Sequence, residues 1–236
     1  MTNTAGLEEP DSGTDALRRD VSFLGAMVGE VLREQDGDEL FGIVEGARVA
    51  ARARRHGDRD SEETLNALLS GLEPLLAAEV ARAFSAYFAV VNMAERVQRI
   101  RRRREYLRSG TPQPGSLDDV MRRLAASGVA HHEVRAVLRE MLVEPVFTAH
   151  PTEAIRRTIL AKEQRVAALL IDRLQHTDRT LPEDAALTGQ LRDEITLMWQ
   201  TAEHPGARRS VSDEIEHVLF YLSDVIYRIV PNLIDY

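Results

Sequence analysis

The sequence predicts a mainly α-helical protein with a single β-strand near residues 142–148. Apolar residues recur at intervals of three and four over most of the chain, which is the spacing of one face of a helix. Polar stretches, or stretches rich in glycine and proline, separate these helical patterns. The segment 142–148 differs from them, because it is a short continuous apolar run of the kind typical of a buried strand.

The N-terminal region, residues 14–108, is expected to be helical and to follow a polar leader, residues 1–13, that we expect to be disordered. A polar break at 35–38 divides two apolar stripes, and a second break at 56–61 precedes a further helix. The longest predicted helix spans 74–108. The two stripes consist of Leu17, Val21, Leu24, Val28 and Val31 and then of Leu40, Phe41, Val44 and Ala47.

A linker at residues 109–116, rich in serine, glycine and proline, separates this region from residues 117–236. Beyond the linker, the same helical spacing predicts helices near 117–126, 131–141, 152–174, 184–203 and 212–230.

The predicted strand has no partner strand in this sequence. An apolar strand without a partner leaves its backbone hydrogen-bonding groups unpaired. Either the interpretation of 142–148 as a strand is wrong, or its partners lie outside the 236 residues. The second alternative would make the chain a fragment.

Composition and charge exclude several classes of protein. The chain has no cysteine, which excludes disulfide frameworks, thiolate metal sites and cysteine nucleophiles. No apolar stretch approaches the roughly 18 residues of a membrane helix, and the acidic start is unlike a signal peptide. With 44% hydrophobic and 29% charged residues, the chain has the composition of a soluble globular protein. We therefore expect a cytoplasmic protein that does not bind membranes.

The net charge of −8 argues against nucleic acid as a main partner, although arginines cluster at 96–108. This arginine run fits either a solvated helix end or a polyanion-binding patch, and its single aromatic residue, Tyr106, favours the former. Glu214 and His217 form one Glu-x-x-His step, whereas a carboxylate-bridged metal site requires two. No metal site is therefore predicted within this chain.

The segment 144–158 carries the features that indicate chemistry. His150 directly follows the predicted strand, and a helix start comes two residues later. Arg156 and Arg157 lie in the first turns of that helix. A titratable histidine beside a helix N-terminus and two arginines suggests an anion site. The alternative is a histidine that only caps the helix or borders the core.

The string VFTAHPTEAIRRT, residues 146–158, resembles the histidine signature of phosphoenolpyruvate carboxylase. The segments LRRDVSFLGAMVGEVLREQ and AFSAYFAVVNMAERVQRIRRRRE resemble the family's N-terminal helix and its long basic-ended helix. MWQTAE and DEIEHVLFY, within residues 198–221, resemble a downstream region of the family. The resemblance extends from about Leu17 onward, and because family chains are several times longer, it implies an N-terminal fragment.

The resemblance implies the N-terminal part of a helix-rich (β/α)8 barrel enzyme. In this interpretation 142–148 is one barrel strand, and 117–236 is the incomplete start of the barrel region with the catalytic histidine loop. The missing strands of the barrel would then be the partners of the orphan strand.

The implied activity joins bicarbonate to phosphoenolpyruvate and gives oxaloacetate and phosphate, through carboxyphosphate and an enolate. This lyase reaction fixes carbon dioxide and supplies a four-carbon acid to the tricarboxylic acid cycle. By its place in the motif, His150 is the expected catalytic base that takes the proton from carboxyphosphate. The family also implies Mg²⁺ or Mn²⁺, an allosteric homotetramer, and metal ligands that lie outside this chain.

Arg156 and Arg157 match an arginine pair that is associated with a sugar-phosphate activator site in plant-type members. The alternative is that both arginines face solvent or pair with nearby acids. The sequence also departs from the family at 201–205, where Thr-Ala-Glu-His-Pro replaces the usual Thr-Asp-Glu-Ile/Leu-Arg. This departure puts sugar-phosphate activation in doubt and does not involve the catalytic histidine.

The family's catalytic lysine, metal-binding acids and glycine-rich loop have no counterpart in these residues, so we expect the chain alone to be inactive. A competing interpretation is a non-catalytic helical protein of the same family that binds a partner through exposed apolar faces. The two interpretations differ in expected behaviour. A fragment should be poorly soluble or molten, whereas a free-standing binding protein should melt cooperatively.

Overall fold

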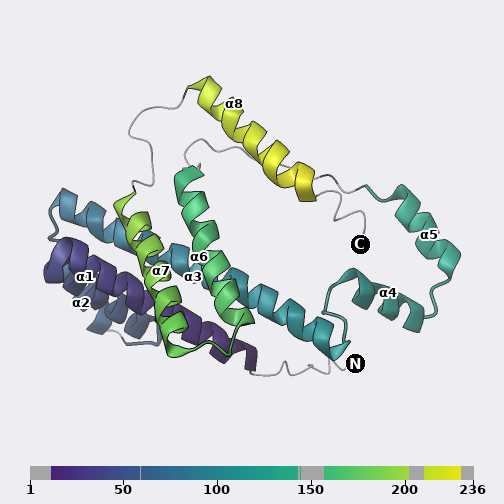
Figure 1. Cartoon of the computed structure of the whole chain (residues 1–236), viewed down its shortest axis with the longest axis horizontal. Coiled ribbons are helices and arrows are strands. Elements are labelled where there is room, and N and C mark those ends of the chain that lie inside the picture. Colours follow the sequence, from purple (N-terminus) through teal and green to yellow (C-terminus); the bar gives the residue numbers. More distant parts are fainter. Residues whose placement is uncertain (1–11, 59, 143, 145–156, 202–209, 230–236) are drawn as a thin grey trace. The chain divides into compact units, whose positions relative to one another are not determined.

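The structure, a computed structural model, describes residues 12–58, 60–142, 144, 157–201 and 210–229 (Figure 1). Two compact units divide the chain: the first comprises Met1–Gln113 and Ala161–Thr201, and the second comprises Pro114–Leu160 and Ala202–Tyr236. The described residues form helices α1 (Ser12–Arg55), α2 (Asp60–Leu69), α3 (Pro74–Ser109), α4 (Leu117–Ala126), α5 (His131–Glu140), α6 (Arg157–Gln175), α7 (Leu181–Gln200) and α8 (Val211–Phe220), with a π-helical segment η1 (Tyr221–Ile226).

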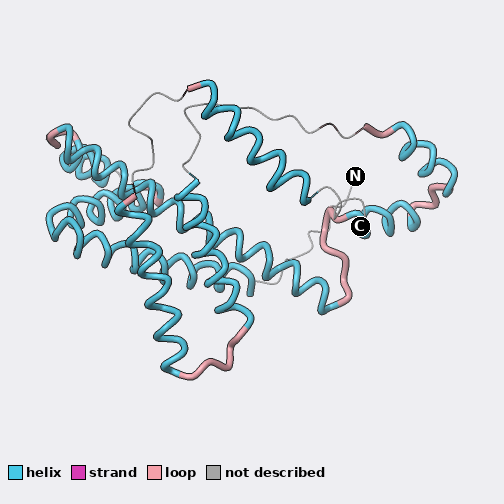
Figure 2. Tube along the Cα trace, turned by 45° about the horizontal axis from the view of Figure 1, so that its top comes forward, coloured by secondary structure: helices cyan, strands magenta, loops and turns pink. Residues whose placement is uncertain are grey.

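The prediction of a mainly helical chain is confirmed. In the part of the chain that the structure describes, Figure 2 shows helices joined by loops and no strand. Of the predicted strand 142–148, Leu142 and Glu144 have irregular backbone, and the other five residues lie outside the described residues. The predicted leader, 1–13, lies outside them as far as residue 11, and α1 begins at Ser12.

The core of the first unit lies between α1, α3, α6 and α7. Its side chains include most of the first predicted stripe, since Leu24, Val28 and Val31 are each less than 5% exposed. The buried residues of the other three helices that belong to this core cluster are Val80, Ala83, Val90, Met93, Ala94, Val97, Val166, Leu170, Leu187, Leu191, Ile195, Met198 and Trp199. Helices α6 and α7 thus pack with the N-terminal helices although they follow the linker.

Helix α1 is broken at Gly37, within the predicted break at 35–38, which divides it into two arms. The backbone of Gly37 has φ 92° and ψ 176°, a conformation that glycine adopts readily and residues with a β-carbon rarely adopt. Two side chains of α7 contact residues next to this break. Trp199 donates a hydrogen bond from Nε1 to Oδ2 of Asp36 over 2.5 Å, and Arg192 forms an ion pair with Glu34.

Helix α3 matches the predicted helix 74–108 and ends at Gly110, which has the left-handed conformation of a C-cap. Among the described helices it alone is long and apolar enough to cross a membrane, by length and composition. Helix α3 contributes buried residues to the core of the first unit, and 17% of its apolar 18-residue window is buried.

The second unit consists of short amphipathic helices. Ser116 caps α4 by accepting a hydrogen bond from the backbone N–H of Asp119 over 3.2 Å. At the start of α5, the carboxylate of Glu133 accepts a hydrogen bond from the backbone N–H of Ala130 over 3.0 Å. Neither α4 nor α5 has a buried residue. The large apolar side chains that these two helices and α8 expose include Leu117, Met121, Val137, Leu138, Ile215, Val218 and Leu219.

Candidate functional site

The predicted catalytic motif falls largely outside the part of the chain that the structure describes. His150 and Arg156 lie outside the described residues, and Arg157 is the first residue of α6. The helix predicted after the motif is present, and its residues Ile159 and Val166 are buried as the apolar spacing indicated. The motif is therefore followed by a helix that is anchored in a core.

Helix α6 is tied to its neighbours by polar contacts as well. Arg165 donates a hydrogen bond from Nε to Oε1 of Glu194 on α7 over 2.6 Å. Glu163 faces α3, where Arg96 lies 3.8 Å away, and its side chain is 11% exposed. Burial raises the pKa of Glu163, and the charge of Arg96 offsets part of that rise.

The arginine run of α3 is partly structural. The Nη2 atom of Arg101 lies 2.7 Å from Oδ2 of Asp20 on α1, and both side chains are less than 20% exposed. Because Arg101 pairs with an acid of another helix while largely buried, it contributes to the packing of this unit, whereas Arg96 is 62% exposed. The interpretation of 96–108 as a solvated helix end therefore holds for only part of the run.

The described residues contain no group of three or more histidine, aspartate or glutamate side chains that could hold a metal ion. Glu214, half of the Glu-x-x-His step, lies on α8 and belongs to no such group.

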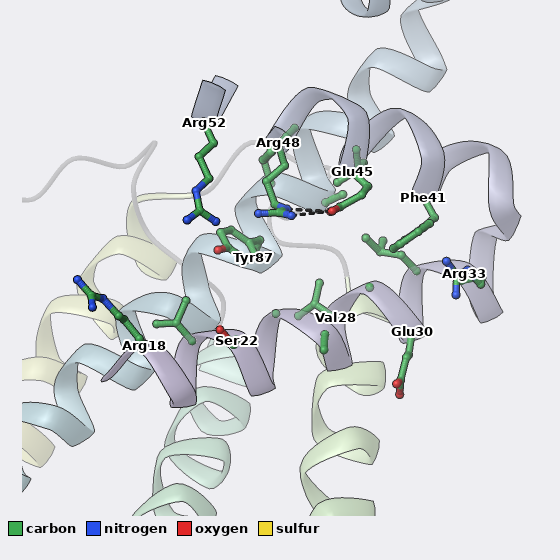
Figure 3. Close-up of a pocket in the computed structure, with 18 of the residues that line it drawn as sticks. Arg18, Ser22, Val28, Glu30, Arg33, Phe41, Glu45, Arg48, Arg52 and Tyr87 are labelled. Carbon is green, nitrogen blue, oxygen red and sulfur yellow. Dashed lines mark hydrogen bonds and ion pairs between the residues drawn. The ribbon is translucent and has the colours of Figure 1, made fainter. Parts of the chain in front are cut away.

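A groove of about 830 Å³ lies between the two arms of α1 and the side of α3, all within the first unit. Figure 3 shows side chains of both arms, with Tyr87 of α3 between them. Its apolar lining includes Val21, Val28 and Phe84. The charged residues that line it are Arg18, Glu30, Arg33, Glu45, Arg48 and Arg52.

Glu45 and Arg48, which both line this groove, form an ion pair. Arg48 donates two hydrogen bonds to the carboxylate of Glu45, from Nε over 2.8 Å and from Nη2 over 2.6 Å, as the dashed lines in Figure 3 mark. The hydrogen bond to Arg48 lowers the pKa of Glu45, and the same bond raises the pKa of Arg48. Both groups therefore remain ionised near neutral pH.

This groove was not predicted from the sequence. Its signal is a row of small residues at helical spacing, Ser22, Gly25, Ala26 and Gly29, on one face of α1. Such a row indicates that something packs closely against the helix or that space is left there. Whether the face is packed or left open depends on the angle between the two arms of α1. The spacing of residues in the sequence does not predict that angle.

Comparison with known proteins connects the chain to a family. A family model described as phosphoenolpyruvate carboxylase matches residues 17–236. Curated proteins named phosphoenolpyruvate carboxylase are similar over nearly the whole chain: one from Xanthomonas euvesicatoria is 50% identical over 221 residues, 93% of this chain and 24% of its own length. Those from Ralstonia nicotianae and Roseiflexus castenholzii are 39% and 34% identical, over 92% and 93% of this chain and 22% and 24% of their own lengths.

Proposed function

The chain belongs to the phosphoenolpyruvate carboxylase family, and on that premise we propose that it supplies the catalytic histidine of a carboxylase that forms oxaloacetate. The chain spans about a quarter of the length of the curated relatives it matches. The family match that includes the motif VFTAHPTEAIRRT, with His150 at its centre, carries the proposal.

In the proposed reaction a bicarbonate oxygen attacks the phosphorus of phosphoenolpyruvate, and the bond from phosphorus to the enol oxygen breaks. The products of this step are carboxyphosphate and the enolate of pyruvate. His150 then takes the proton of the carboxyphosphate carboxyl, and the intermediate separates into phosphate and carbon dioxide. The enolate carbon attacks carbon dioxide, which gives oxaloacetate. Histidine suits this role because its pKa lies near the working pH.

We propose that the complete enzyme has a further part beyond these residues, because the chain spans about a quarter of the length of its curated relatives. We expect the remaining active-site groups and the ligands of Mg²⁺ or Mn²⁺ to belong to that further part, as the resemblance to the family implies. The exposed apolar faces of α4, α5 and α8 support this view, because a folded enzyme covers such faces. The proposed barrel, with 142–148 as one of its strands, would provide that cover.

Further features of the proposed enzyme rest on the family alone. The proposed enzyme is a cytoplasmic homotetramer that responds to allosteric effectors, and its oxaloacetate feeds the tricarboxylic acid cycle. Arg156 and Arg157 are the proposed anion site for an effector, and the altered segment 201–205 is expected to weaken the response to sugar phosphates.

A chimeric enzyme tests the role of His150. Residues 17–236 of this chain replace the matching quarter of the Xanthomonas euvesicatoria relative, and oxaloacetate formation is followed by its reduction with NADH and malate dehydrogenase. His150→Gln should lower the rate by about 10²- to 10⁴-fold, the usual contribution of a general base. The matched control, His132→Gln, changes a histidine outside the motif and should keep the rate of the chimera. Equal rates for the two variants would contradict the assignment.

A further inference from the structure

The groove between the two arms of α1 has the size and shape of a binding site for a small molecule. Its volume of about 830 Å³ lies within the range of pockets that hold ligands. Ser22 and Ala26, which face it, are small and exposed, so the space in front of the first arm stays open. The opposite wall is formed by the second arm, which carries Phe41, Glu45, Arg48 and Arg52.

Two aromatic rings form part of the apolar lining because two glycines allow them to approach the helix. A β-carbon on Gly25 would lie 3.1 Å from Cε2 of Tyr87, and one on Gly29 would lie 3.0 Å from Cε2 of Phe41. Both distances are shorter than ordinary van der Waals contact. Glycine at these positions therefore lets one edge of the Tyr87 ring and one edge of the Phe41 ring approach the first arm of α1, so that both rings contribute to the apolar lining of the groove.

The charges of the groove favour an anion, although the chain as a whole has a net charge of −8. Three of the four arginines that line it already have acidic partners, namely Asp15, Asp38 and Glu45. Arg52 has no ion-pair partner among the described residues, and it extends into the groove in Figure 3. One guanidinium group is thus left without a counter-ion beside an apolar surface.

A second hydrogen-bond donor lies in the same groove. Tyr87 is half-buried, and its hydroxyl forms no hydrogen bond within the part of the chain that the structure describes. A phenol hydroxyl can donate to a phosphate or carboxylate oxygen, and a guanidinium group binds both kinds of head group with its planar fork. Arg52 and Tyr87 both line the groove, so each can offer a donor to an anion bound there.

From these observations we propose that the groove binds a small organic anion, with a phosphate or carboxylate head at Arg52 and Tyr87 and an apolar body between the arms of α1. The body packs on Val21, Val28 and the aromatic rings, and the head replaces the counter-ion that Arg52 lacks. This site is independent of His150, so the proposal does not depend on the carboxylase reaction.

Titration of the 236-residue chain with 1-naphthyl phosphate, 1-naphthoate and neutral 1-naphthol tests the proposal by calorimetry. We expect saturable binding of at least one of the two anions at one site per chain, and the anion that binds identifies the head group as phosphate or carboxylate. Arg52→Gln should weaken that binding by about tenfold, in line with the loss of one charge-assisted hydrogen bond. Arg55→Gln, an exposed arginine of the same helix that does not line the groove, is the matched control and should leave binding unchanged.

Ala26→Phe provides a second test, because a large side chain at an exposed position fills the groove without changing the core. It should abolish the binding, and circular dichroism should show the same helix content as in the parent chain. The proposal is overturned if neither anion saturates a site, if 1-naphthol binds as tightly as the anions, or if Arg52→Gln and Arg55→Gln behave alike.

Discussion

At the scale of single residues, Glu163 stands out because its carboxyl group is buried without full compensation. Its folded-state pKa lies above the ordinary value of 4.5. Since the folded protein holds this proton more tightly than the unfolded chain, its protonation stabilises the fold, and that contribution is lost as the pH rises through the folded pKa. Above the folded pKa the group is ionised, and its burial then costs free energy.

Glu163→Gln is therefore expected to stabilise the chain at pH 7 and to have little effect below pH 4. A gain of about 1 kcal/mol would raise the Tm by about 2–4 °C for a chain of this size. Arg96, which loses its partner, is 62% exposed and stays hydrated. Thermal melts at both pH values measure the effect, with the exposed Glu105→Gln as a control of equal charge. A lower Tm at pH 7 for Glu163→Gln alone would mean that the ion pair with Arg96 outweighs the cost of burial.

At the scale of secondary structure elements, the break in α1 is held by backbone conformation. Gly37 has a positive φ, so Gly37→Ala should destabilise the chain by about 1–3 kcal/mol, the cost of a side chain in a backbone region that glycine alone adopts readily. Gly42→Ala is the matched control, because Gly42 lies five residues later in the second arm, without a positive φ and with open space around it. That change should stabilise the helix by up to about 1 kcal/mol. Urea denaturation measures both variants, and shifts in the same direction would refute the assignment of the break to Gly37.

Most of the helices could be predicted from the sequence, because the spacing of apolar residues records which face of each helix is buried. The break at 35–38 could be predicted as well, since Gln35, Asp36, Gly37 and Asp38 interrupt that spacing. The π-helical segment η1 could not be predicted. Its backbone hydrogen bonds join residues five apart instead of four, and this difference does not change the apolar pattern.

The packing of helices that are far apart in the chain could not be predicted from the sequence. The composition of 109–116 marks where the chain leaves the first unit, but it does not show that α6 and α7 return to it. The hydrogen bond between Trp199 and Asp36 joins residues 163 positions apart, and the groove depends on the angle between the arms of α1. The predicted site residues His150 and Arg156 rest on the family resemblance alone, and both lie outside the described residues.

At the scale of the whole molecule, the two units differ in how much core they contain. The first has a continuous apolar core, whereas no residue of α4 or α5 is buried. Hydrogen exchange of the isolated chain should therefore be slow in α1, α3 and α7 and fast in α4 and α5, because backbone amides outside a packed core open readily. Equal protection of all five helices would favour the competing interpretation, a free-standing binding protein.

We propose that these 236 residues carry the catalytic histidine of a carboxylase but only part of its active site. The most direct test compares oxaloacetate formation from phosphoenolpyruvate and bicarbonate by the purified chain alone and by the chimera with the Xanthomonas euvesicatoria relative. The expected result is no activity for the chain alone and bicarbonate-dependent activity for the chimera. Oxaloacetate formation by the chain alone, or a folded chimera without activity, would contradict it.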